Sequence, residues 1–207
     1  MEFLDAVFVV AVIVMSAVIH EVMHGVAAEQ LGDPTARLQG RITLNPISHL
    51  DPFGSVLLPI ILVLTQAPIF FAWAKPVPYN PYNLRPGRFS EAIVAGAGPA
   101  SNLTIALIGG FFIRLGVLGG MSDIVFTIVL INVMLFFFNL IPIPPLDGSK
   151  IASAILPRAL ARGYDNIRTQ LEWNPLLGFG AVILFIVVAG GAFSGLIWGV
   201  ARAIAGV

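Results

Sequence analysis

Long uninterrupted apolar segments are the main feature of the hydrophobic pattern in this chain. A helix of about 20 mostly apolar residues is long enough to cross the hydrocarbon core of a bilayer. Four segments meet this test, and we predict a membrane-spanning helix in each of them: Ala6–Ala28, Ala92–Leu118, Ile124–Ile141 and Leu176–Ile204. The pattern therefore predicts an all-α polytopic membrane protein.

A fifth apolar run, Phe53–Trp73, is interrupted by Pro59, by Pro68 and by the polar pair Thr65-Gln66. Proline breaks the hydrogen-bonding pattern of a helix, so this run is either a kinked span or a re-entrant segment. The number of transmembrane helices is accordingly four to five.

The stretch Arg37–Leu44 has a different pattern, because its apolar and polar residues alternate. Such alternation is typical of a strand with one buried face. The dipeptides Asp33-Pro34 and Asn45-Pro46 on either side are turn signals. We therefore expect a small membrane-associated β-hairpin here, which is either an ordinary interfacial hairpin or an edge that binds substrate.

The composition of the 207 residues supports a membrane protein, since 57% are hydrophobic and only 11% are charged. So few charges could not cover the surface of a soluble domain of this size. The formal net charge is zero, which argues against nucleic acid as a partner. The N-terminal flank is acidic, unlike that of a secretory signal, so we expect a retained membrane helix. We predict one domain over residues 1–207, with a catalytic core at about 6–149 and a C-terminal helix at about 176–204.

The basic residues are concentrated in three linkers, roughly 29–52, 74–90 and 147–173, which contain nine of the eleven lysines and arginines. The positive-inside rule places these linkers on the cytoplasmic side of the cell membrane and the N-terminus outside. If the first two linkers share a side, Phe53–Trp73 cannot be one complete crossing, and it is expected to be re-entrant. Backbone that is not helical at that depth fits beside a water-filled cavity.

The run His20-Glu21-Val22-Met23-His24 carries the clearest chemical signal. On a helix, positions i and i+4 share a face, so both imidazoles can bind one metal ion while Glu21 serves as general base. Ionisable residues within a membrane helix are costly and usually functional. The run therefore predicts a zinc hydrolase.

A zinc site with two histidines needs a third protein ligand and an open position for water. Among the acidic residues Asp147 fits best, because it follows the third span at its cytoplasmic end, and His20 and His24 lie at the same end of the first span. Glu29 points away from the ligand face, and His49 is expected to form local hydrogen bonds rather than to bind metal.

Together these runs resemble the site-2 protease family of membrane-embedded zinc metalloproteases. The resemblance rests on the histidine motif and on Asn139–Gly148, which is similar to the second family motif. Ala97–Asn102 resembles a third family element, and Gly40–Pro46 and Trp73–Pro78 resemble a compact prokaryotic branch. The resemblance covers about Ile19–Ser149, and we expect a catalytic core without accessory domains.

The resemblance implies hydrolysis of a peptide bond in or near the transmembrane helix of a single-span substrate. One zinc ion per chain would be bound by His20, His24 and Asp147, and Glu21 would activate a zinc-bound water. Asn139, and more weakly Asn102, would hold the substrate or stabilise the oxyanion. For both asparagines the alternative is interhelical hydrogen bonding.

Three other functions compete with this one. A membrane metal-ion transporter would have its ligands spread along a pathway, whereas here they are expected at one depth. A non-proteolytic scaffold that binds helices would lack a key residue, and none is missing. A metalloprotease with a glutamate as third ligand would use Glu91 or Glu172, and neither lies in a suitable motif.

Overall fold

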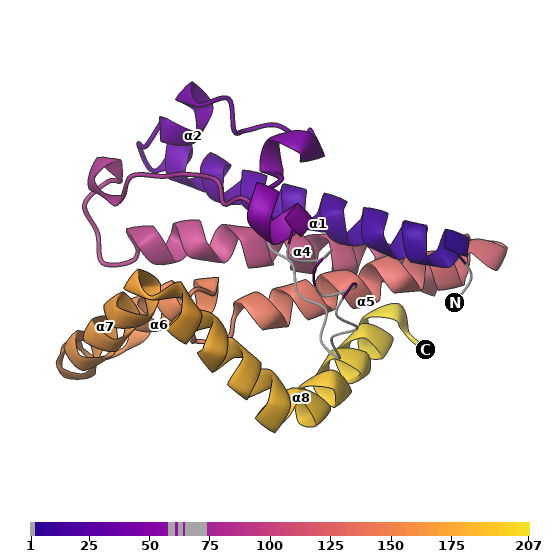
Figure 1. Ribbon diagram of the computed structural model, residues 1–207. Coiled ribbons are helices and arrows are strands. Elements are labelled where there is room, and N and C mark those ends of the chain that lie inside the picture. The colour runs from indigo at the N-terminus through magenta and orange to yellow at the C-terminus, as the bar shows by residue number, and fades with distance from the viewer. Residues whose placement is uncertain (1–2, 58–60, 62–63, 65–73) are drawn as a thin grey trace. The chain divides into compact units, whose positions relative to one another are not determined.

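The computed structural model describes residues 3–57, 61, 64 and 74–207, and it is helical with no strand in these residues. Four helices are long and apolar enough to cross a membrane: α1 (Phe3–Gln30), α4 (Ser90–Arg114), α5 (Ser122–Asn139) and α8 (Pro175–Ala205) (Figure 1). They confirm the four predicted spans. Many of their apolar side chains are exposed, such as Val10, Leu107 and Val187, as expected for surfaces that lipid covers.

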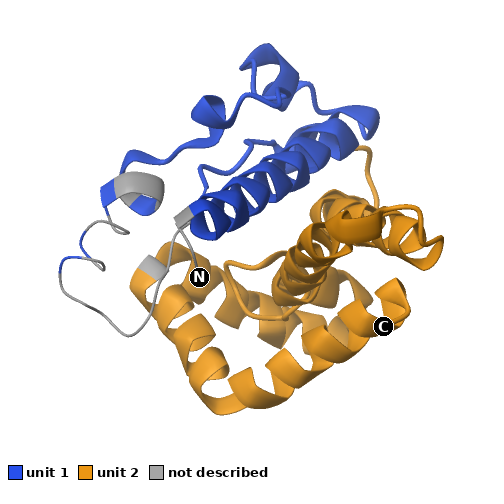
Figure 2. Cartoon of the chain, turned by 90° about the vertical axis from the view of Figure 1, so that its right-hand side faces the viewer, with its two compact units in different colours: residues 1–84 blue, residues 85–207 orange. Residues whose placement is uncertain are grey.

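The chain divides into two compact units, Met1–Leu84 and Arg85–Val207, which Figure 2 shows in two colours. Among its described residues, the first unit contains α1 and the short helical elements α2 (Thr35–Leu38), η1 (Pro46–His49), η2 (Pro52–Leu57) and η3 (Pro81–Asn83).

Asp33 organises the first unit from the loop after α1. Its side chain is fully buried and accepts hydrogen bonds from the backbone N–H and hydroxyl of Thr35, at 3.2 and 2.5 Å. It also accepts from the N–H of Asn80 at 2.6 Å and from the side-chain amide of Asn83 at 2.9 Å. Burial alone would raise the pKa of Asp33, but these four hydrogen bonds outweigh it and hold the pKa below its ordinary value. One carboxylate thus fastens residues 80–83 to the end of α1.

The predicted strand and β-hairpin at Arg37–Leu44 are wrong. The first two of these residues belong to α2, and the rest of the stretch is a turn followed by irregular backbone. Leu38 is 81% exposed, although the alternating pattern predicted that its side chain would be buried. The hydrogen bonds from Thr35 to Asp33 favour a helical turn instead, since such local side-chain contacts compete with strand pairing.

The predicted re-entrant segment Phe53–Trp73 lies mostly outside the described residues. Its first residues belong to η2, a short π-helical turn whose Gly54 N–H is bound by the Asp51 carboxylate at 2.6 Å. Re-entry of the segment stays a prediction.

The second unit packs α4 against α5, and α8 lies against both. Its core consists of small and β-branched side chains: Ala106 from α4, Val129 and Val133 from α5, Ile197 and Ala201 from α8. A Cβ on Gly110 would lie 2.7 Å from the carbonyl oxygen of Ile204, so this glycine permits a close approach of α4 and α8. Figure 1 shows a bend near the middle of α8. By residue number, Gly190-Gly191 lies at the centre of this helix, and paired glycines are an ordinary cause of a kink.

Three shorter elements complete this unit: the 3₁₀ turn η4 (Gly119–Met121) between α4 and α5, and the helices α6 (Asp147–Ile155) and α7 (Arg158–Trp173). α6 packs against α4, and α7 contacts α6 and the start of α8. Three prolines lie between α5 and α6: Pro142, Pro144 and Pro145. Because proline cannot continue a helix, they explain why α5 ends before Asp147.

Candidate active site

The two predicted histidine ligands lie next to each other on α1. The ring centroids of His20 and His24 are 4.7 Å apart, and the ring planes are almost perpendicular, at 87°. Both side chains are buried, with 5% and 8% of their surface exposed. Because the rings share one face of the helix, their nitrogens can bind the same ion, as the sequence predicts. The chemistry of this donor pair fits zinc.

Glu21 follows His20 directly, and its carboxylate has a defined partner. Its Oε2 accepts a hydrogen bond of 2.8 Å from the backbone N–H of Val77, a residue 56 positions later. The Val77 side chain is itself buried. The predicted general base is therefore held in one orientation by backbone that is distant in sequence.

The segment that carries Val77 is fixed by further hydrogen bonds. The Arg41 guanidinium donates to the carbonyl oxygens of Lys75 and Pro76, at 2.9 and 3.3 Å. The Lys75 N–H donates to the carbonyl oxygen of His49 at 2.8 Å. We call residues 75–78 the strap, because hydrogen bonds with Glu21, Arg41 and His49 hold this segment at several points.

Gly25 allows the strap to approach α1 one turn after Glu21. A Cβ at this position would lie 3.0 Å from Val77 Cγ1 and 3.1 Å from the Cβ of Ala36. A larger side chain would therefore push both neighbours away from the helix. Gly25 thus leaves room for Val77, whose N–H donates the hydrogen bond to Glu21.

His49 forms a local hydrogen bond, as predicted. Its side chain is buried, and its Nε2 lies 2.8 Å from the carbonyl oxygen of Thr43. The residue therefore supports the loop that binds Lys75.

Asp147 is the first residue of α6 in the second unit. A carboxylate in the first turn of a helix is favoured by the helix dipole. The next residue, Gly148, is buried so closely against the end of α5 that a Cβ would lie 2.6 Å from the carbonyl oxygen of Ile141 and closer still to Leu140. The position of Asp147 is thus set by backbone contacts.

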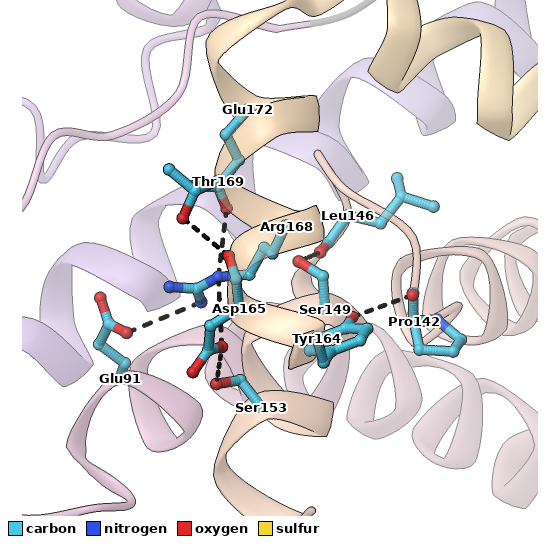
Figure 3. A network of polar contacts seen from close by, with 10 residues as sticks. All are labelled: Glu91, Pro142, Leu146, Ser149, Ser153, Tyr164, Asp165, Arg168, Thr169 and Glu172. Carbon is cyan, nitrogen blue, oxygen red and sulfur yellow. Dashed lines mark hydrogen bonds and ion pairs between the residues drawn. The ribbon is translucent and has the colours of Figure 1, made fainter. Parts of the chain in front are cut away.

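The loop before Asp147 is supported from both sides. The Tyr164 hydroxyl of α7 donates to the carbonyl oxygen of Pro142 at 3.0 Å, and the Ser149 hydroxyl donates to that of Leu146 at 2.7 Å (Figure 3). Burial raises the pKa of Tyr164 above its ordinary value of 10.0.

The two predicted substrate-binding asparagines have different surroundings. The Asn139 side-chain amide is half-buried and donates to the Leu135 carbonyl oxygen of its own helix at 3.0 Å. Asn102 is fully buried on α4, and its amide donates to the side-chain oxygen of Asn132 on α5 at 3.0 Å. Asn102 thus makes the interhelical hydrogen bond that was the alternative to substrate binding.

The six predicted site residues are divided between the two units. His20, Glu21 and His24 lie together in residues 1–84, whereas Asn102, Asn139 and Asp147 belong to residues 85–207. The shared metal site of the two sets stays a prediction. Sequence reasoning missed the roles of Val77 and Asn132. An amide in the middle of an apolar span signals Asn132, while only the prolines on either side mark the N–H of Val77.

Comparison with known proteins identifies the family. The model of Peptidase family M50 matches residues 114–172. The chain is 36% identical over 196 residues to "Putative zinc metalloprotease YwhC" of Bacillus subtilis (strain 168), covering 90% of this chain and 83% of that one. It is 29% identical over 190 residues to "Putative zinc metalloprotease Rip2" of Mycolicibacterium smegmatis, covering 88% and 66%. No solved structure matches. With its four apolar helices, the chain belongs to the M50, or site-2 protease, family of membrane zinc metalloproteases.

Proposed function

We propose that this metalloprotease hydrolyses a peptide bond in or near the transmembrane helix of a single-span membrane protein, with Glu21 as general base. The observation that carries the proposal is the arrangement on α1. Glu21 lies beside the paired imidazoles of His20 and His24, and the Val77 N–H holds one oxygen of its carboxylate. A carboxylate next to two histidine ligands is suited to take a proton from an attacking water.

We assign His20, His24 and Asp147 as the ligands of one zinc ion. Two imidazoles and a carboxylate are three protein ligands, a set that leaves a fourth position open as catalytic zinc sites do. When bound, zinc would polarise the scissile carbonyl and make a water ligand more acidic. The assignment of Asp147 is supported by the family match, since the matched segment contains this residue and Asn139.

We assign the proton transfer to the second carboxylate oxygen of Glu21. Oε2 accepts the hydrogen bond from Val77, so Oε1 is the atom that we assign to take the proton and to return it to the leaving amine. Asn139 uses one amide hydrogen on its own helix, which leaves its carbonyl oxygen and second N–H for an unwound substrate. We propose this role for Asn139.

The test replaces Glu21 with Gln and measures zinc content and cleavage of a single-span substrate in proteoliposomes. We expect one zinc per chain to be retained and cleavage to fall by about 10²–10⁴-fold, which is the usual contribution of a general base. Glu29→Gln is the matched control, since Glu29 lies on the same helix and pairs with the exposed Arg37. Unchanged cleavage by Glu21→Gln would disprove the proposal. Full zinc occupancy in Asp147→Ala would disprove the assignment of Asp147 as the third zinc ligand.

We also propose that the N-terminus lies outside and the active site near the cytoplasmic face, as the basic linkers indicate. The chain has no cysteine, so single cysteines can report the topology directly. We expect a membrane-impermeant thiol reagent to label the exposed Gly120→Cys in intact cells, but to label Gln39→Cys and Gln170→Cys only after permeabilisation. The opposite labelling pattern would show that the chain has the reverse orientation in the membrane.

A further inference from the structure

A basic cavity lies in the second unit at the start of α4, between α6 and α7. Its volume is about 350 Å³. The lining contains four basic and two acidic side chains, together with small residues: Arg88, Lys150, Arg158, Arg162, Glu91, Asp165, Ser153, Ala154 and Ala161. The cavity is separate from the residues assigned to catalysis, and its charge suits an anion.

Both acidic residues of the cavity are directed at an arginine that does not line it. Arg168 lies 3.8 Å from the carboxylate of Glu91 and 4.0 Å from that of Asp165 (Figure 3). Asp165 also accepts a hydrogen bond of 2.5 Å from the Ser153 hydroxyl. Arg168 therefore offsets part of the negative charge of these two carboxylates, and basic side chains outnumber them on the cavity wall.

The three arginines of the cavity keep their positive charge available. Arg88 donates to the backbone carbonyl oxygen of Leu156, which is a neutral partner. Within the described part of the chain, no carboxylate forms an ion pair with Arg158 or Arg162. The lining therefore contains more basic than acidic side chains, and Arg158 and Arg162 are the cations that can bind an anion.

The cavity lies where a span meets the membrane surface. Arg88 and Glu91 flank the first residue of α4, which is long and apolar enough to cross the bilayer. Lipid phosphates occupy this depth. Next to the cavity, Ile155 at the end of α6 and Leu160 on α7 are 68% and 62% exposed, and such apolar side chains can contact acyl chains.

We propose that this cavity binds the phosphate group of an anionic phospholipid. The guanidinium groups of Arg158 and Arg162 match a phosphate in charge and in hydrogen-bonding geometry, and they are one helical turn apart on α7. A lipid is favoured over free phosphate because exposed apolar side chains border the cavity. Since Tyr164 of the same helix supports Pro142, a bound lipid would also steady the loop before Asp147.

The experiment uses the full chain in detergent with dioleoyl phosphatidylglycerol, dioleoyl phosphatidylcholine or inorganic phosphate. Native mass spectrometry measures bound lipid, and thermal unfolding measures its effect on stability. The test variant is Arg158→Gln/Arg162→Gln. The control is Arg85→Gln, an exposed arginine in the same unit that does not line the cavity.

We expect phosphatidylglycerol to bind the wild type and Arg85→Gln, and to raise their unfolding midpoints. Its affinity for the double variant is expected to fall about thirtyfold, while the midpoint of that variant in phosphatidylcholine shows that it is folded. Equal retention by the double variant, or equal binding of phosphatidylcholine, would overturn the proposal. If inorganic phosphate bound as tightly as phosphatidylglycerol, the assignment of a lipid as the ligand would be wrong.

Discussion

Gly148→Ala is expected to damage both the stability of the protein and its activity. A Cβ at this position would lie 2.6 Å from the carbonyl oxygen of Ile141, and closer still to the carbonyl carbon and oxygen of Leu140. All of these neighbours are backbone atoms at the end of α5, so no side-chain rotation can relieve the contact. The start of α6 must therefore move away from α5.

The size of the effect follows from this geometry. Overpacking a buried site costs about 1–3 kcal/mol, and here the upper half of that range applies because backbone must shift. About 2 kcal/mol would lower the unfolding midpoint of a chain of this size by roughly 5 °C. Asp147 moves with α6, and a misplacement of about 1 Å in a catalytic arrangement can cost about 10²-fold in rate. Zinc occupancy should fall with it.

The assay compares thermal unfolding in detergent, zinc content and substrate cleavage for Gly148→Ala and Gly163→Ala. Gly163 lies in α7, and apart from its chain neighbours and the nearby backbone of its own helix no described atom lies within 4 Å of the position that a Cβ would take there. Alanine at this position should gain about 0.5–1 kcal/mol of helix propensity and leave zinc and cleavage intact. A Gly148→Ala protein with wild-type midpoint, zinc content and cleavage would refute the reasoning about the α5–α6 contact.

Three further predictions concern other contacts. Asp33→Asn should destabilise the first unit by roughly 2 kcal/mol at neutral pH, because it loses charge-assisted hydrogen bonds. The pKa of Asp33 is depressed in the folded state, so the carboxylate stabilises the fold fully at pH values above its ordinary pKa of 3.8, and this contribution is lost as the pH falls below 3.8. Urea unfolding of the wild type and of Asp33→Asn across this pH range should show the difference in their free energies of unfolding disappearing. Val77→Pro removes the donor to Glu21 and should reduce cleavage at least about tenfold with zinc retained, whereas Val77→Ala keeps the donor and most of the activity. Asn132→Leu should cost about 1–3 kcal/mol by leaving the buried Asn102 amide without this partner, and the double leucine variant should recover much of that loss in thermal unfolding.

The four membrane helices could be predicted because long apolar runs are read directly from the sequence. The strand predicted at Arg37–Leu44 rested on a weaker signal, because its apolar and polar residues alternate over a short stretch only. There the local hydrogen bonds of Thr35 with Asp33 decided the backbone, and α2 buries Ala36 while Leu38 remains exposed. An alternating pattern over only eight residues is weak evidence for a strand. A nearby side chain whose hydrogen bonds can start a helical turn outweighs it.

The histidine pair was predictable because the spacing of four residues on a helix fixes which side chains meet. The support of Glu21 was not, since it depends on a backbone N–H 56 residues away, and every residue except proline carries such a group. The pairing of Asn102 with Asn132 shows a second limit of sequence reasoning. A polar residue in an apolar span can serve chemistry or satisfy another polar residue, and only its partner distinguishes the two roles.

The composition of the strap now has a physical explanation. Val77 lies between Pro76 and Pro78, and proline has no backbone N–H. Within these three residues the chain offers a single donor, and that donor is bound to Glu21. The two prolines also restrict the backbone on either side, which keeps the donor in place. A carboxylate at the end of a membrane helix thus receives one rigid hydrogen bond, which orients one of its oxygens while the other is left to take the proton.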